Sequence, residues 1–182
     1  MADEPGDGDG DLEPFTDTAL YALGAYFADR HPELMDDVVA QAQQQLERDG
    51  STRALQIARL MLDGEIAAQE KKYDEAIKHL NAAVKIEAGL RYDEPPDWTI
   101  PVRHALGAAL LNVGRVQEAE QVYRDDLKLQ PNNGWSLFGL FDSLRRQDKS
   151  DEAIEVEKQF NSVWAKADTR IDSSCLCQPA VR

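Results

Sequence analysis

Few side chains in this sequence have a type and spacing that could perform chemistry. Cys175 and Cys177 lie one residue apart, and two thiolates at this spacing could chelate a soft metal such as copper(I) or zinc. A complete zinc site needs two further ligands, and no spacing brings His31, His79 or His104 close to the pair. We therefore expect no metal and no cofactor. The alternative function is a metal- or thiol-dependent protein, such as a small enzyme, that uses this cysteine pair.

Alternating Asp and Gly at residues 7–11 resemble the start of a calcium-binding loop. An EF-hand loop beginning at Asp7 requires glycine at its sixth position and glutamate at its twelfth. Those positions are Leu12 and Thr18. The run is rich in Gly, Pro and acidic residues, so we interpret residues 1–14 as a disordered acidic tail rather than a metal site.

No catalytic motif accompanies these residues. The sequence has no glycine-rich phosphate-binding loop, no nucleophile elbow and no His-Glu-x-x-His. Its formal net charge of −14, from 34 acidic and 20 basic residues, is opposite in sign to surfaces that bind nucleic acid or anionic lipid. No apolar run approaches the ~20 residues of a membrane-spanning helix. We therefore predict a cytoplasmic, acidic protein that is not an enzyme and binds neither nucleic acid nor membrane.

The elements that must position any site are helices. From Phe15 onward, apolar residues recur at helical spacing, which predicts two helices before residue 50. His31-Pro32 separates the two, since a residue that precedes proline avoids the α region. Gly50 suits the left-handed conformation that often ends a helix. Residues 15–50 are therefore predicted to form a helical hairpin.

A 34-residue period runs through the rest of the chain. Residues Glu75-Ala76 extend it towards the amino terminus, if an insertion of nine residues at about 91–99 is allowed for. A period of 34 is the length of a tetratricopeptide repeat, which is a helix-turn-helix unit. The identical residues at this spacing are Leu106 and Leu140, Leu110 and Leu144, Glu118 and Glu152, and Ala119 and Ala153.

The middle unit also resembles a tetratricopeptide repeat at individual positions. Gly107 and Ala119 are small enough for two helices to cross closely, and Tyr123 fills the space beneath that crossing. Asp126 replaces a usual alanine, and the third unit has Phe141 at the glycine position. Thr99, Asn133 and Ser150 are expected helix caps, with Gly114 in a turn. The expected helix pairs are 52–69 with 73–88, 100–113 with 116–129, and 134–147 with 150–167.

Four longer runs resemble a family of bacterial and eukaryotic tetratricopeptide-repeat proteins with no well-defined biochemical activity. They are YDEPPDW, PVRHALGAALL, EAEQVYRDDL and PNNGWSLFGL, and the resemblance covers about residues 52–170. It implies an all-α fold, a right-handed α-α superhelix of about three helix pairs. Residues 15–50 would then be an N-terminal helical cap, residues 51–168 the repeat domain and residues 169–182 a C-terminal tail.

Stacked repeats form a concave groove that is lined mainly by the first helix of each pair. We therefore expect a non-catalytic scaffold whose partner is another protein or a peptide segment laid in this groove. For Trp135 and Phe138, the alternative is packing against the terminal helix. The projected groove residues are Met61, Glu65, Gln69, His104, Asn112, Trp135, Phe138, Asp142 and Arg145.

The insertion contains Asp93, Glu94 and Trp98 around two prolines. In one interpretation it is a rigid loop that contacts the ligand over one edge of the groove. In the other, which we favour, Trp98 anchors the loop on the core and the acidic residues pair with Arg91 or Arg103.

Overall fold

All the secondary structure elements in the part of the chain that the structure describes are helices, as the sequence predicts. The structure is a computed structural model, and it describes residues 53–90 and 98–175. The expected acidic tail (1–14) and helical cap (15–50) lie outside these residues. None of the described helices is long and apolar enough to cross a membrane. The helices are α3 (Arg53–Gln69), α4 (Tyr73–Glu87), α5 (Val102–Asn112), α6 (Val116–Leu129), α7 (Gly134–Arg145) and α8 (Ser150–Trp164).

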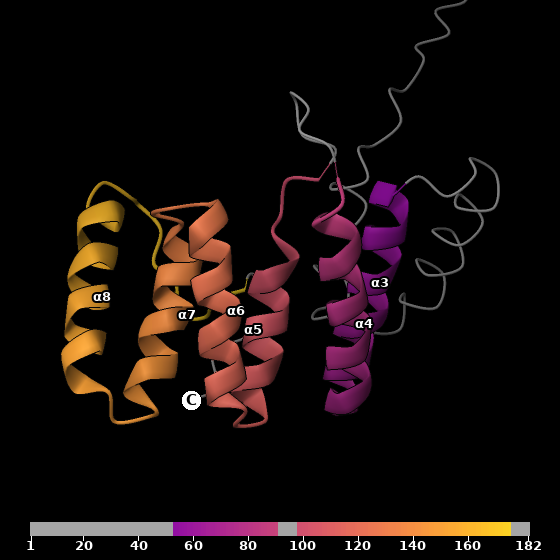
Figure 1. Ribbon diagram of the computed structural model, residues 1–182, viewed down its shortest axis with the longest axis horizontal. Helices are drawn as coiled ribbons and strands as arrows, with labels where there is room; N and C mark the ends of the chain where they lie inside the picture. The colour runs from indigo at the N-terminus through magenta and orange to yellow at the C-terminus, as the bar shows by residue number, and fades with distance from the viewer. Residues whose placement is uncertain (1–52, 91–97, 176–182) are drawn as a thin grey trace, which may run out of the picture.

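The helices form three pairs arranged in a row, with α3 and α4 at one end and α8 at the other (Figure 1). Each helix packs on the next, and α5 also contacts both α3 and α7. The second helices of the pairs, α4, α6 and α8, make no comparable contact with one another. The first helices therefore lie closer together, on the inner side of the stack.

One turn geometry recurs at the repeat spacing. Lys71, Gly114 and Asp148 all have a positive φ, of 62°, 74° and 58°, and follow the first helix of each pair. After each of them, the next backbone N–H donates to a carbonyl near the end of that helix: Lys72 to Ala67 at 2.8 Å, Arg115 to Leu110 at 2.9 Å and Lys149 to Leu144 at 3.1 Å. The bond satisfies a carbonyl that the helix end leaves without a partner. Gly114 was expected to occupy such a turn, whereas Lys71 and Asp148 adopt the same conformation without being glycine.

The helix bounds agree with the expected ones to within about three residues, but two expected caps are wrong. The side chain of Asn133 caps α7 as predicted, accepting from the N–H groups of Trp135 at 3.0 Å and Ser136 at 3.3 Å. Helix α5 begins after Pro101 rather than after Thr99, because a carboxylate of the preceding repeat serves as its cap. Ser150 is the first residue of α8, and its N-cap is Lys149.

Residues one repeat apart lie in equivalent surroundings. Leu106, Leu110, Leu140 and Leu144 are each at most 4% exposed, and Ala76, Ala119 and Ala153 are each at most 5% exposed. Burial of equivalent positions in successive pairs is the property that generates a continuous core in stacked repeats. The period read from the sequence therefore corresponds to a structural repeat.

The ring of Tyr123 is fully buried between α5 and α7. A Cβ at Gly107 or at Gly139 would lie 2.3 Å from this ring, so both helices need glycine where they flank it. Gly64 and Leu80 form the matching contact in the first pair, with the same separation of 16 residues as Gly107 and Tyr123. In α7 the close approach is at Gly139 and is made to Tyr123 of the second pair, whereas the position equivalent to Gly107 is occupied by Phe141.

Candidate binding groove

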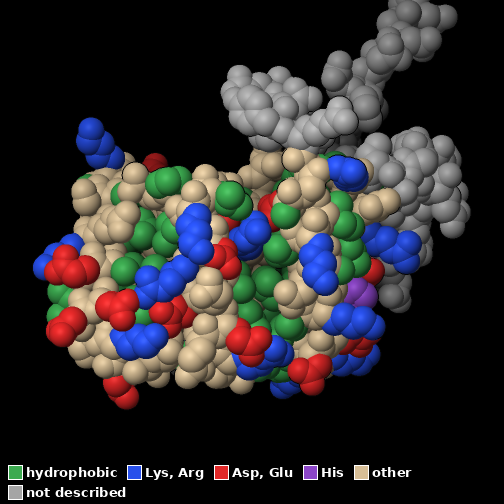
Figure 2. All heavy atoms as spheres, viewed as in Figure 1, with side chains coloured by type: hydrophobic (Ala, Val, Ile, Leu, Met, Phe, Trp, Pro, Cys, Tyr) green, Lys and Arg blue, Asp and Glu red, His purple; other side chains and the backbone are tan. Residues whose placement is uncertain are grey.

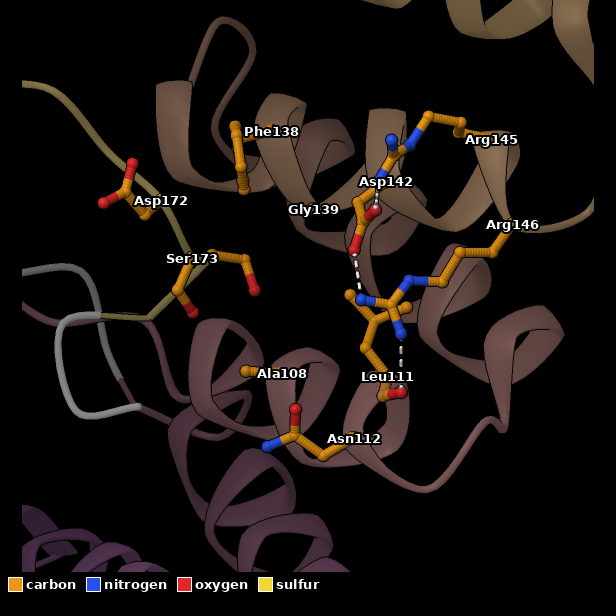
Figure 3. A pocket seen from close by; sticks show the side chains of 11 residues that line it. Ala108, Leu111, Asn112, Phe138, Gly139, Asp142, Arg145, Arg146, Asp172 and Ser173 are labelled. Atoms are coloured by element: carbon orange, nitrogen blue, oxygen red, sulfur yellow. Dashed lines mark hydrogen bonds and ion pairs between the residues drawn. The ribbon is translucent and has the colours of Figure 1, made fainter. Parts of the chain in front are cut away.

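A cavity of about 120 Å³ opens between α5, α7 and the chain that follows α8 (Figure 3). Because α5 and α7 are first helices of their pairs, the cavity lies on the inner side of the stack. It is lined by Ala108, Leu111 and Asn112 from α5, by Phe138, Gly139, Asp142, Arg145 and Arg146 from α7, and by Asp172, Ser173 and Ser174.

Four of the projected groove residues line this cavity together: Asn112, Phe138, Asp142 and Arg145. They come from the second and third pairs and bring an amide, an aromatic ring, a carboxylate and a guanidinium to one place (Figure 3). Gln69, the last residue of α3, is exposed and is not part of the lining.

Three other projected residues point into the protein rather than into the cavity. Met61 is 1%, Glu65 2% and His104 6% exposed. The His104 Nε2 atom lies 3.4 Å from the Asp126 carboxylate, and Asp126 accepts a hydrogen bond of 2.6 Å from the Ser136 hydroxyl. His104 therefore belongs to a buried polar network that joins α5, α6 and α7, and the unusual Asp126 lies at its centre.

Trp135 packs on the terminal helix, as the alternative interpretation expected. Its ring meets the ring of Trp164 edge-on, with centroids 6.0 Å apart. Phe138 meets Phe160 at 5.8 Å, and Phe160 stacks on Trp164 at 5.9 Å. Phe138 therefore takes both expected roles, because one side of it packs on α8 while another lines the cavity.

The charges that α7 contributes to the cavity are paired. Asp142 forms ion pairs with Arg145 at 3.0 Å and with Arg146 at 2.7 Å, and Arg146 also donates to the Leu111 carbonyl at 3.0 Å. The Arg145 side chain is 68% exposed, which makes its guanidinium the more accessible of the two. Basic and acidic side chains are likewise interspersed over the face seen in Figure 2. Such a surface does not select ligands by a single sign of charge.

Trp98 lies in the core and not over the groove. It is 7% exposed, packs in the same apolar cluster as Val102, and donates from its indole N–H to the Ile100 carbonyl. Arg103 pairs with Glu87 at 3.3 Å, while Asp93 and Glu94 lie outside the described residues. This geometry agrees with the interpretation in which Trp98 anchors the insertion.

The helix cap of α5 comes from that same Glu87. Its Oε1 atom accepts from the Val102 N–H at 3.0 Å, and Oε2 faces Arg103. Burial raises the pKa of Glu87 above its usual value, although the Val102 hydrogen bond and the Arg103 charge act in the opposite direction. The contact ties the first pair to the second.

The chain after α8 contributes residues that sequence reasoning did not assign to the groove. Ile171 is 7%, Ser174 3% and Cys175 8% exposed, and the hydroxyls of Ser174 and Tyr123 are hydrogen-bonded. Burial raises the pKa of Tyr123 far above its usual range. This segment has no periodic pattern. The one indication in the sequence is Tyr123, because the hydroxyl of a buried tyrosine requires a hydrogen-bond partner.

The metal-binding alternative gains no support from this geometry. No group of three or more His, Cys, Asp or Glu side chains within 53–90 and 98–175 is arranged to hold a metal ion. Cys175 is disulfide-bonded and belongs to the main apolar cluster, while Cys177 lies outside the described residues. A cysteine binds a metal ion through its thiolate, and a sulfur atom in a disulfide is not a thiolate.

The repeated turn, the recurring buried positions and the glycine contacts define a helix-turn-helix unit. Residues 63–89 match the family model of the tetratricopeptide repeat. This matched stretch covers the end of α3, the turn and α4. No curated protein matches the chain.

Several solved structures of MamA share the fold. One described as MamA AMB-1 has 22% identity and a TM-score of 0.55, covering 83% of this chain and 74% of the other. MamA MSR-1 has 20% identity and the same TM-score, covering 86% and 81% of the two chains. A further crystal structure of MamA protein has 16% identity and a TM-score of 0.55, covering 85% and 78%. At such identities the likeness shows the fold alone, an all-α stack of helical repeats.

Proposed function

We propose that this protein is a non-catalytic scaffold that binds an extended segment of another protein in the groove between α5 and α7. One observation carries the proposal: a non-helical stretch of the chain itself, residues 172–174, lies along this groove. A surface that accommodates irregular polypeptide chain, with apolar and polar groups side by side, has the character of a peptide-binding groove.

The size of the cavity supports a peptide over a small molecule. Pockets for small molecules occupy about 300–1,000 Å³. A cavity of about 120 Å³ has room for roughly one side chain. Phe138 would contact the apolar part of that side chain, while Asn112 and Arg145 would hold the register of the segment through hydrogen bonds.

The composition of the lining supports binding without catalysis. The residues around the cavity include no His, Cys, Glu or Lys. The one carboxylate that α7 contributes to the cavity, Asp142, is already engaged in ion pairs with Arg145 and Arg146. We also propose that the partner is neither nucleic acid nor membrane, because the two arginines of the lining, Arg145 and Arg146, are matched by two carboxylates, Asp142 and Asp172.

Two matched variants test the groove. Arg145→Ala removes an exposed cation at the cavity, and Lys158→Ala removes an exposed cation of α8 that is paired in the same way with a residue three positions earlier. Affinity capture from cells, quantified by mass spectrometry, should lose a specific partner with Arg145→Ala and retain it with Lys158→Ala. An identical set of partners for both variants and the wild type would exclude this groove as the binding surface.

A further inference from the structure

The segment after α8 turns back along the inner side of the stack and occupies part of the groove. The indole N–H of Trp164 donates to the Thr169 carbonyl at 2.7 Å, which holds the chain where it reverses. From the end of α8, the segment passes behind α7 towards α5 and α6 (Figure 1). Asp172 and Ser173 lie across the cavity from Arg145 (Figure 3). The segment thereby occupies one side of the groove between α5 and α7.

The hydroxyl contact at Ser174 depends on a gap between two helices. Tyr123 lies on α6, behind α5 and α7, and reaches the groove only because Gly107 and Gly139 have no Cβ. Its hydroxyl meets that of Ser174, which is 3% exposed. A fully buried phenol requires such a partner, so the groove offers a fixed hydrogen-bonding position for a small hydroxyl residue.

Apolar burial accompanies this polar contact. Ile171, three residues before Ser174, is 7% exposed, whereas Asp172 between them is exposed to solvent. The pattern is therefore an apolar residue, an acidic residue facing solvent and the cavity, and a hydroxyl residue over Tyr123. A segment with the same order of residue types would fit this groove.

We propose that residues 169–175 are an internal competitor for a partner segment of the same chemistry. This inference rests on the proposed function of the groove. A partner segment with an apolar residue three positions before a Ser or Thr binds only when the protein's own segment leaves. If the internal segment is seated ~90–99% of the time, the apparent affinity for the partner falls ~10–100-fold. The segment thus sets the threshold at which the scaffold engages its partner.

The test compares three forms of the full chain: wild type, Ile171→Asp and Arg170→Ala. Ile171→Asp puts a charge where the segment is buried, whereas Arg170 is exposed beside it. The probe is a fluorescein-labelled peptide of residues 168–175 that carries Cys175→Ser, and its binding is followed by fluorescence anisotropy. We expect Ile171→Asp to bind the peptide at least about ten-fold more tightly than the wild type, and Arg170→Ala to equal the wild type. Equal affinities for all three forms, or no binding to any, would overturn the proposal.

Hydrogen exchange shows whether the variant still folds. In Ile171→Asp, amides of 171–175 should exchange faster while those of α5 and α7 stay protected. A second variant, Ser174→Trp, is too large for its place over Tyr123 and should release the segment in the same way. If 171–175 already exchange in the wild type as fast as the exposed residues 165–170, the segment is not seated and the inference is wrong.

The two proposals fail in different ways. If the released groove binds the peptide but Arg145→Ala leaves cellular partners unchanged, the internal competitor stands and the proposed function fails. If Arg145→Ala removes a partner but release of the segment changes no affinity, the function stands and the competitor is wrong.

Discussion

The ring of Tyr123 on α6 lies against the backbone of Gly139 on α7, so closely that a Cβ at residue 139 would be 2.3 Å from a ring carbon. The contact joins the second repeat to the third. Gly107 makes the equivalent contact within the second repeat. The same two glycines that let three helices approach one another also open the path by which Tyr123 meets Ser174, so repeat packing and the groove depend on one side chain.

Gly139→Ala should therefore destabilise the protein. A new methyl group would force the buried ring or the helix to move, and overpacking of this kind costs about 1–3 kcal/mol. Unfolding in urea, followed by circular dichroism, measures the change. Gly89→Ala is the control, because the nearest atom to its new Cβ is 3.4 Å away, an ordinary contact.

A double-mutant cycle identifies the cause. Tyr123→Leu with Gly139→Ala should cost less than the sum of the two single changes, since the smaller side chain leaves space for the methyl group. Strictly additive costs would mean that the ring is not what requires glycine at this position.

The period of 34 was sufficient to locate the repeat from sequence. It follows from hydrophobic residues and small residues that recur in every pair, such as Leu106 with Leu140 and Ala119 with Ala153, so the six helices within residues 53–90 and 98–175 and their order could be predicted. The glycine of the third pair could not be located in this way. It lies at Gly139 rather than at Phe141, because the ring it accommodates belongs to the preceding repeat and reaches α7 from another direction.

The site was predictable only in part, for a physical reason. The helical period shows which side chains share a face, and from it Asn112, Phe138 and Arg145 were assigned to one groove, where they line one cavity. It does not tell how deeply that face is covered, and Met61 and His104 are buried. The segment around Ser174 has no periodicity, so only its tertiary contacts reveal its place in the groove.

Glu120 should make stability dependent on acid pH. It accepts from Arg124 at 2.8 Å on α6, and from Gln147 at 2.8 Å and Lys149 at 2.7 Å in the next repeat. Although burial raises its pKa, these hydrogen bonds lower the pKa from the usual 4.5 to about 2. The unfolded chain therefore binds a proton that the folded one does not, and this contribution is complete above about pH 4.5 and is lost between there and pH 2.

Glu120→Gln should consequently cost about 1–3 kcal/mol at pH 7 and progressively less as the pH falls below 4.5. Urea unfolding of both forms at pH 7, 5 and 3.5, values chosen to span the usual carboxyl range, measures the difference. Glu118→Gln is the control, since that exposed pair with Arg115 should contribute little at any pH. A cost for Glu120→Gln that does not vary with pH would contradict the assignment.

Asp126 should be the most sensitive member of the buried polar network. Its side chain is 2% exposed and accepts from Ser136 at 2.6 Å, with His104 at 3.4 Å. Asp126→Ala leaves the buried Ser136 hydroxyl without its acceptor and removes the carboxylate that lies beside His104, for which we expect a loss of about 3 kcal/mol. Ser136→Ala removes one hydrogen bond and should cost about 1–2 kcal/mol. Thermal unfolding ranks the two, and a smaller cost for Asp126→Ala would show that the carboxylate is dispensable.

Trp164 should determine how firmly the terminal helix is attached. Ala153 is the one buried residue that α8 contributes, so the attachment of this helix relies on its partly buried aromatic rings. The ring of Trp164 contacts Trp135 and Phe160, and its N–H holds Thr169. Terminal elements with few buried contacts open locally, without unfolding of the rest.

Trp164→Ala should therefore speed hydrogen exchange in α8 and in residues 169–175 by about ten-fold or more, while α5 keeps its protection. Trp164→Phe should separate the attachment of α8 from the seating of residues 169–175, because it keeps an aromatic ring against Trp135 but loses the hydrogen bond to Thr169. In that variant residues 169–175 should exchange faster while α8 changes little. Val163→Ala, at a neighbouring exposed position, is the control. Equal acceleration in α5 and α8 would mean that the stack opens as one unit, and that the terminal helix has no separate role in seating the segment.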